Sequence, residues 1–155
     1  MTLYHGTTYN FTTPDLNKAR SNTDFGKGFY LTDKEKMAEN WTKGKNNSTI
    51  MNYDLSLINN PDSYQLSVKR FTTNEEWFKY VYNNRKGKNT SKDYDIVIGP
   101  IADNGIKKFF KLVESKKAKI SDVVNEMNMK QFGALQYCFK TKEAIKLLRL
   151  CHQEN

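Results

Sequence analysis

Apolar residues recur along the chain with two different periods, and each period predicts a different kind of element. Short alternating or continuous apolar runs predict strands. These runs cover residues 2–5, 29–31, 50–55, 64–68, 96–98 and 135–139. Apolar residues at helical spacing predict amphipathic helices. These lie at residues 37–41, 77–81, 106–113, 120–127 and 144–151, with a short helix opening at Pro14. Strands at both ends with helices between them predict an α+β fold.

Two segments have the residue types of a helix-capping box. Thr32 with Glu35, and Thr73 with Glu76, place a hydroxyl three residues before a glutamate. In such a box each side chain bonds a backbone N–H at the start of the helix. We therefore expect Thr32 to cap a helix that ends near Lys43, and Thr73 to cap the next.

Length and composition indicate one folded domain over residues 1–155. The chain is 37% hydrophobic and 13% aromatic, which is typical of a globular core rather than of a disordered chain. No apolar run approaches the length of a membrane span. The first residues lack a basic start followed by an apolar segment, so we expect a cytoplasmic protein without a membrane partner.

The charge of the chain favours acidic partners. The formal net charge is +8, and two clusters carry most of the excess: Lys79, Arg85, Lys86, Lys88 and Lys92, then Lys107, Lys108, Lys111, Lys116, Lys117 and Lys119. These clusters suit a nucleic acid or an acidic protein, although solvated helix faces give the same pattern. Arg85 to Asp93 is expected to be surface.

The cysteines do not suggest a disulfide framework or a metal centre. Cys138 lies in an expected strand and Cys151 on an apolar helix face, which favours buried reduced thiols. With only His5 and His152 beside them, no zinc-like spacing exists, so no metal is expected.

The segment from Asp24 to Trp41 has the most specific sequence pattern. Gly26 and Gly28 mark a tight turn or a close approach to a ligand, and an expected strand and helix follow. Phe25-Gly26-Lys27-Gly28-Phe29-Tyr30 resembles the signature of the poly(ADP-ribose) polymerase catalytic domain. Leu3-Tyr4-His5-Gly6-Thr7 resembles the first motif of that family. The whole chain also resembles a bacterial family of uncharacterised domains, domain of unknown function 3990, in the ADP-ribosyltransferase clan.

This resemblance implies a fold, a co-substrate and a set of contacts. The fold would be two small sheets packed against each other, with NAD in the cleft between them. His5 would bond the ribose hydroxyls next to adenine, and Gly6 would expose backbone groups to the nicotinamide carboxamide. Tyr30 and Trp41, eleven residues apart, would enclose the nicotinamide ring. The remaining cofactor contacts would come from Thr7, Arg20, Gly28 and Phe29, with Arg20 pairing with the pyrophosphate.

The sequence departs from the polymerase pattern at the third catalytic position. Polymerising members carry a glutamate on a late strand, where this chain has Gln136. An amide can hold a hydroxyl but cannot act as a carboxylate base. This disfavours chain elongation and favours mono-transfer. Asp103, which follows the strand at 96–98, or Asp24 beside the glycines could supply the missing negative charge.

The expected function is therefore an NAD-dependent mono-ADP-ribosyltransferase with His5, Tyr30, Gln136 and Asp103 as catalytic residues. The acceptor would be a macromolecule, protein or nucleic acid. The small stand-alone form suggests a bacterial toxin or phage-conflict effector, with a cognate antitoxin protein as a possible partner. The alternatives are an NAD glycohydrolase on the same site and a non-enzymatic nucleic-acid-binding module using the lysine clusters. An RNA 2′-phosphotransferase ranks lower, because Phe29-Tyr30-Leu31 replaces its basic strand.

Overall fold

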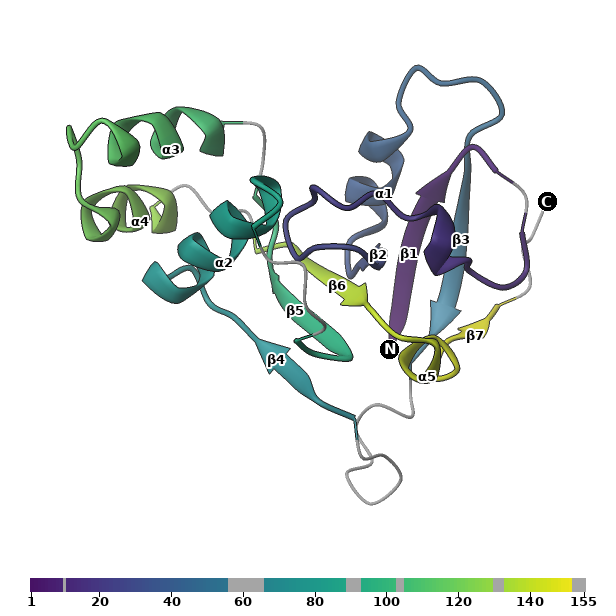
Figure 1. Ribbon diagram of the computed structural model, residues 1–155. Coiled ribbons are helices and arrows are strands. Elements are labelled where there is room, and N and C mark those ends of the chain that lie inside the picture. The colour runs from purple at the N-terminus through teal and green to yellow at the C-terminus, as the bar shows by residue number, and fades with distance from the viewer. Residues whose placement is uncertain (10, 56–65, 89–92, 103–104, 130–132, 152–155) are drawn as a thin grey trace.

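The computed structural model describes residues 1–9, 11–55, 66–88, 93–102, 105–129 and 133–151. Seven strands form one curled sheet (Figure 1). They are β1 (Thr2–Thr7), β2 (Phe29–Thr32), β3 (Thr49–Asp54), β4 (Val68–Arg70), β5 (Ile96–Pro100), β6 (Leu135–Phe139) and β7 (Arg149–Leu150). The helices are η1 (Leu16–Lys18), α1 (Glu35–Trp41), α2 (Glu75–Arg85), α3 (Ile106–Glu114), α4 (Ile120–Asn128) and α5 (Lys142–Ile145). The α+β prediction is confirmed.

The strand order is β4-β5-β6-β2-β1-β3-β7, and β4 and β5 are the parallel pair. The junction between β1 and β2 is narrow, because Tyr4 and Thr32 form its one recorded pair. By contrast, β1 pairs with β3 at six positions and β2 with β6 at four. The expectation of two small sheets packed against each other is therefore wrong. One sheet has two halves that share a single residue pair.

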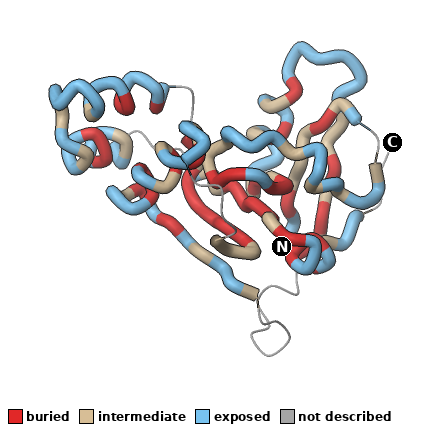
Figure 2. Tube along the Cα trace, viewed as in Figure 1, coloured by how far each residue is buried: buried red, intermediate tan, exposed pale blue. Residues whose placement is uncertain are grey.

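The core divides between the two faces of the sheet. In β5, Ile96 and Ile98 enter one apolar cluster, while Val97 enters the other. All three are almost completely inaccessible to solvent, as the continuous apolar run predicts. Helices α2, α3 and α4 cover the Val97 side, and α5 contributes to the other. Figure 2 shows the buried residues concentrated along the strands and on the helix sides that face them.

Neither of the two threonines expected to cap a helix does so. Thr32 ends β2 instead, where it pairs with both Tyr4 and Gln136 and its hydroxyl accepts from the backbone N–H of Lys34. Helix α2 is capped by Asn74, whose Oδ1 accepts from the Trp77 N–H at 2.9 Å. Asparagine is at least as good an N-cap as threonine.

Two segment boundaries also differ from expectation. The strand expected at 64–68 begins at Val68 instead, and residues 64 and 65 lie outside the described residues. The closing helix expected at 144–151 ends at Ile145, and the chain then returns as β7 against the edge of β3. Cys151 is thus not on a helix face. Cys138 is fully buried, and burial raises the pKa of its thiol to about 12, so it stays protonated.

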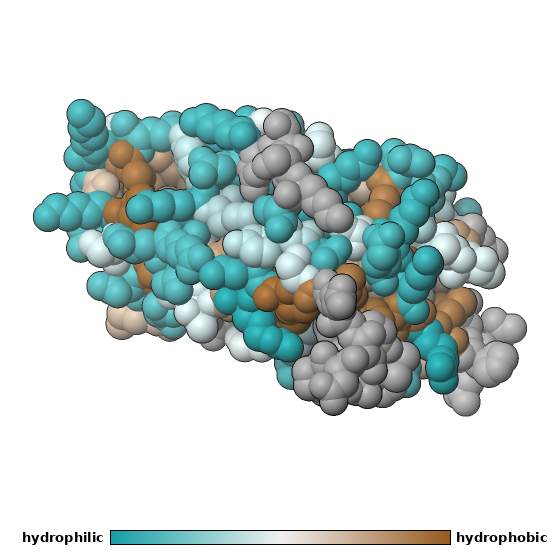
Figure 3. Space-filling model, turned by 60° about the horizontal axis from the view of Figure 1, so that its bottom comes forward, coloured by the Kyte–Doolittle hydropathy of each residue, from teal (hydrophilic) through white to brown (hydrophobic). Residues whose placement is uncertain are grey.

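No helix within the described residues is long and apolar enough to cross a membrane. The face in Figure 3 is largely hydrophilic, with apolar side chains in a few small areas.

Candidate functional site

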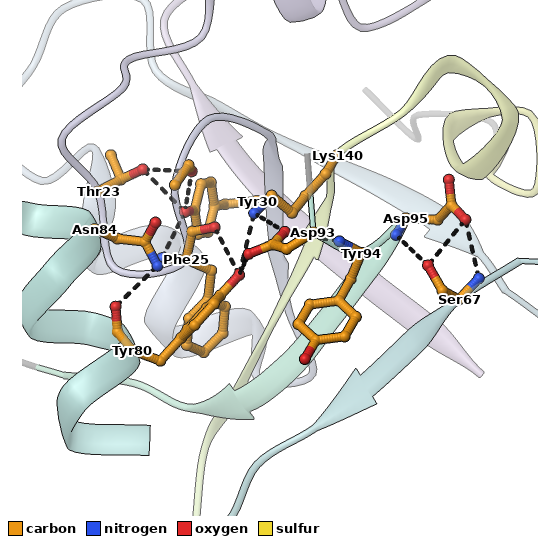
Figure 4. Close-up of polar contacts among 11 residues, drawn as sticks. Thr23, Phe25, Tyr30, Ser67, Tyr80, Asn84, Asp93, Tyr94, Asp95 and Lys140 are labelled. Atoms are coloured by element: carbon orange, nitrogen blue, oxygen red, sulfur yellow. Dashed lines mark hydrogen bonds and ion pairs between the residues drawn. The ribbon is translucent and has the colours of Figure 1, made fainter. Parts of the chain in front are cut away.

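The hydroxyl of Tyr30 holds residues 23–26 in place, and we call these residues the glycine segment. That hydroxyl lies 2.9 Å from the Phe25 N–H and 2.9 Å from Thr23 Oγ1, and it donates to the Gly26 carbonyl. Gly26 has a positive φ of 83°, which favours glycine. Burial raises the pKa of Tyr30 well above its ordinary value, so the phenol stays neutral. Tyr30 therefore positions residues 23–26 (Figure 4). Its stacking on a nicotinamide ring stays a prediction.

His5 connects the two sequence motifs at the narrow β1–β2 junction. Its Nδ1 lies 2.6 Å from the Tyr30 carbonyl oxygen. Because a carbonyl only accepts, Nδ1 carries the hydrogen, and Nε2 of the neutral ring is left as an acceptor. Burial lowers the pKa of His5, and the bond to Tyr30 offsets this only in part. The imidazole is thus neutral at pH 7.

Aromatic side chains surround the His5 ring. Phe29 lies 4.3 Å away between ring centroids, Phe11 lies 6.0 Å away, and Trp41 lies 6.4 Å away with its ring nearly perpendicular. Trp41 is the last residue of α1 and remains partly exposed. His5 and Trp41, both predicted to contact NAD, thus lie beside each other, and their contact with a cofactor stays a prediction. Phe11 was missed, since no local pattern links it to the motifs.

Gly6 and Gly28, the small residues of the two motifs, lie where another segment of the chain packs closely against them. A Cβ on Gly6 would collide with the backbone carbonyl of Ala38 in α1, and one on Gly28 would collide with the sulfur of Cys138 in β6. Thr7 is buried and accepts from the Tyr9 N–H at 3.0 Å. Close approach of chain segments therefore explains both glycines. Contacts of Gly6, Thr7 and Gly28 with a cofactor stay predictions.

Gln136 lies on the face of the sheet opposite its neighbour Tyr137 and is nearly inaccessible to solvent. Its amide nitrogen donates to Asp24 Oδ2 at 3.0 Å and points at the Pro100 carbonyl at 3.4 Å. The other oxygen of Asp24 accepts from Arg85 Nε at 2.6 Å. Arg85 also donates to the Ala102 carbonyl at 3.0 Å. The third position therefore holds an amide, a carboxylate and a guanidinium in contact.

A second polar group lies beneath the glycine segment (Figure 4). Lys140 Nζ lies 2.6 Å from Asp93 Oδ1 and 3.1 Å from the Tyr80 hydroxyl. Tyr80 donates to Asp93 Oδ2 at 2.6 Å. Burial alone would raise the pKa of Asp93, but the bonds from Lys140 and Tyr80 outweigh it and lower that pKa. The carboxylate is thus ionised and fixed.

These contacts correct the expectation of surface at Arg85 and Asp93, the two ends of that segment, whereas residues 86–88 are exposed as expected and 89–92 lie outside the described residues. The side chains of Arg85 and Asp93 are each only 17% exposed. Both polar groups join residues distant in the chain, which no local pattern could reveal. Arg20 is exposed, and Asp103 lies outside the described residues. Among the described residues there is no cluster of three or more metal-ligating side chains.

Comparison with known proteins gives one match. The family model described as "Protein of unknown function (DUF3990)" matches residues 1–150. No curated protein and no solved structure matches the chain. Since the match covers nearly the whole chain, this protein belongs to the DUF3990 family.

Proposed function

We propose that this protein is an NAD-dependent mono-ADP-ribosyltransferase. It would break the bond between nicotinamide and ribose in NAD and transfer ADP-ribose to a macromolecular acceptor. The observation that carries the proposal is the contact between the two motifs: His5 donates to the Tyr30 carbonyl at 2.6 Å, and Trp41 lies 6.4 Å from the imidazole. Segments far apart in the sequence thus bring a fixed histidine and a partly exposed indole together.

The chemistry requires the ribose to be oriented and the departing nicotinamide to be held. The neutral His5 ring offers Nε2 as an acceptor for a ribose hydroxyl, and its orientation is fixed by the bond at Nδ1. Trp41 offers an aromatic face to the cationic pyridinium ring, which gains stacking and cation–π energy. Tyr30 acts by holding residues 23–26 in place.

Positive charge develops on the ribose as nicotinamide leaves, and a nearby carboxylate would stabilise it. Asp24 is the carboxylate in contact with Gln136, at 3.0 Å. Its two oxygens accept from Gln136 and Arg85, so Asp24 is held in one orientation. Gln136 stands where polymerising members carry a glutamate, and an amide cannot act as a carboxylate base, so the proposal is one transfer per acceptor rather than chain elongation.

The test uses NAD labelled in two places. With label in the nicotinamide, release measures bond cleavage; with label in the adenosine, incorporation into protein or nucleic acid of a cell lysate measures transfer. We expect both signals from the wild type and neither from His5→Ala. Tyr9→Ala, an exposed aromatic change near the same strand, is the control and should keep both.

Free ADP-ribose without a labelled macromolecule would indicate an NAD glycohydrolase instead. Full nicotinamide release by a folded His5→Ala would overturn the assignment of His5. No release by the wild type in any lysate would overturn the proposal. A toxin role would appear as growth arrest on expression of the wild type, relieved by His5→Ala.

A further inference from the structure

Helices α3 and α4 form a hairpin beside α2, at the end of the molecule away from β7 (Figure 1). Its apolar side chains Ile106, Phe109, Phe110, Val123 and Val124 are buried in the cluster shared with α2. The opposite side is exposed over the length of both helices, as Figure 2 shows. Lys107, Lys108, Lys111, Lys116, Lys117 and Lys119 are all exposed, and we call them the lysine face.

The lysine face differs from the other basic cluster in its partners. In the first cluster, Arg85 pairs with Asp24 and Lys86 pairs with Glu114 at 3.3 Å. Across the described residues, no ion pair involves a lysine of the lysine face. Lys108 lies 5.0 Å over the ring of Phe109, a cation–π contact that brings no negative charge to the ammonium. The positive charge of this face is therefore not neutralised within the described structure.

The turn of the hairpin adds an independent observation. Lys116 has a positive φ of 60°, where glycine is the residue with least strain. A lysine there interacts favourably with the carboxyl end of α3, and its side chain is exposed at the tip. The sequence thus places a charge where backbone geometry favours glycine.

We propose that the lysine face binds double-stranded nucleic acid through its phosphates. Helix α3 has nine residues and so spans about 13 Å, a length over which a duplex carries about eight negative charges. Few acidic protein surfaces match this density of charge. The two aromatic residues of the hairpin, Phe109 and Phe110, are buried, so the face lacks the stacking platforms that single strands require. Contact would be independent of sequence and of NAD.

The binding should depend steeply on salt. Six lysine–phosphate contacts predict a slope of log K against log salt of about −5, or a loss of about a thousandfold between about 50 and about 200 mM salt. The probe is a fluorescent duplex of about 20 base pairs, as DNA and as RNA, followed by anisotropy.

Two variants that have the same net charge distinguish binding by the lysine face from binding by the overall positive charge of the protein. The face variant carries Lys107→Gln, Lys111→Gln, Lys116→Gln and Lys117→Gln. The control variant carries Lys34→Gln, Lys36→Gln, Lys43→Gln and Lys45→Gln, at exposed positions in and around α1. We expect the face variant to bind at least about a hundredfold more weakly, with a slope reduced by about 3 to 4, and the control to lose far less.

Equal losses in the two variants would overturn the proposal, since binding would then follow net charge alone. No binding of either duplex by the folded wild type near 50 mM salt would also overturn it. Poly-glutamate that displaces the duplex at equal charge concentration would point to an acidic protein as the partner instead. All of the substituted side chains are exposed, so unchanged melting temperatures are expected.

Discussion

Replacing Lys140 with methionine removes one partner of a buried ion pair beneath the glycine segment. The ammonium lies 2.6 Å from Asp93, and the two side chains are 10% and 17% exposed. Methionine keeps the length and apolar stem of lysine but leaves the Asp93 carboxylate with less compensation. Lys69→Met is the matched control, because Lys69 also lies 2.6 Å from its partner, Glu76, while these side chains are 28% and 60% exposed.

The expected costs differ because burial decides the value of an ion pair. Breaking a buried pair leaves an uncompensated charge and costs about 3 kcal/mol or more. Breaking an exposed pair costs about 1 kcal/mol or less, since water screens both charges. The difference of about 2 kcal/mol is roughly a thirtyfold change in the unfolding equilibrium.

Urea unfolding followed by circular dichroism measures both costs directly. The pH dependence adds a second readout: the lowered pKa of Asp93 contributes stability that is present above the ordinary aspartate pKa and is lost as pH falls toward the folded value. Lys140→Met should remove much of that acid dependence. If Lys140→Met costs no more than Lys69→Met at pH 7, the ion pair does not contribute as the structure implies.

Three further changes have defined outcomes. Gly28→Ala should lower the free energy of unfolding by about 3 kcal/mol, because the added methyl group would clash with β6. Gly44→Ala should lower it by about 1 kcal/mol, because Gly44 has open space around it but a φ of 79°. The packing argument would be refuted if urea unfolding showed Gly28→Ala to be the milder change. The imidazole of His5 should titrate below its ordinary pKa of 6.5 by NMR, so stability should fall as pH drops below that value; a midpoint at or above it would contradict the buried neutral ring. Gln136→Glu should lower stability by about 2 kcal/mol at pH 7, because it places a carboxylate against Asp24, and the loss should shrink as pH falls; an unchanged unfolding midpoint would exclude that contact.

The parts of the fold that were predicted correctly have strong local patterns. The continuous β-branched run at Ile96 to Ile98 is typical of a strand buried on both faces, and the helical spacing of Ile106, Phe109 and Phe110 matches their burial in α3. The end of the chain was misassigned because residues 144–151 fit a helix locally. The unpaired edge of β3 instead binds Arg149 and Leu150 as a strand.

The candidate site, like the fold, could be predicted from the sequence only in part. The two short motifs named His5, Tyr30 and Trp41 as candidate NAD contacts, and the fold brings the rings of His5 and Trp41 to 6.4 Å, while their contact with NAD stays a prediction. The pairs of Arg85 with Asp24 and of Lys140 with Asp93 join residues 61 and 47 positions apart. Judged from the sequence alone, each of these charged residues is typical of the protein surface. Only the fold shows that it is buried and paired.

The most direct test of the NAD proposal is the fluorescence of Trp41 in a Trp77→Phe background. Trp77 is fully buried and donates to the Pro100 carbonyl at 3.2 Å, so the background is first checked for cooperative unfolding. NAD and nicotinamide should each change the Trp41 emission saturably, because the pyridine ring would lie against the indole. ADP-ribose, which lacks that ring, should change it much less. NAD that leaves both the emission and the melting temperature of the protein unchanged would contradict a nicotinamide site beside Trp41.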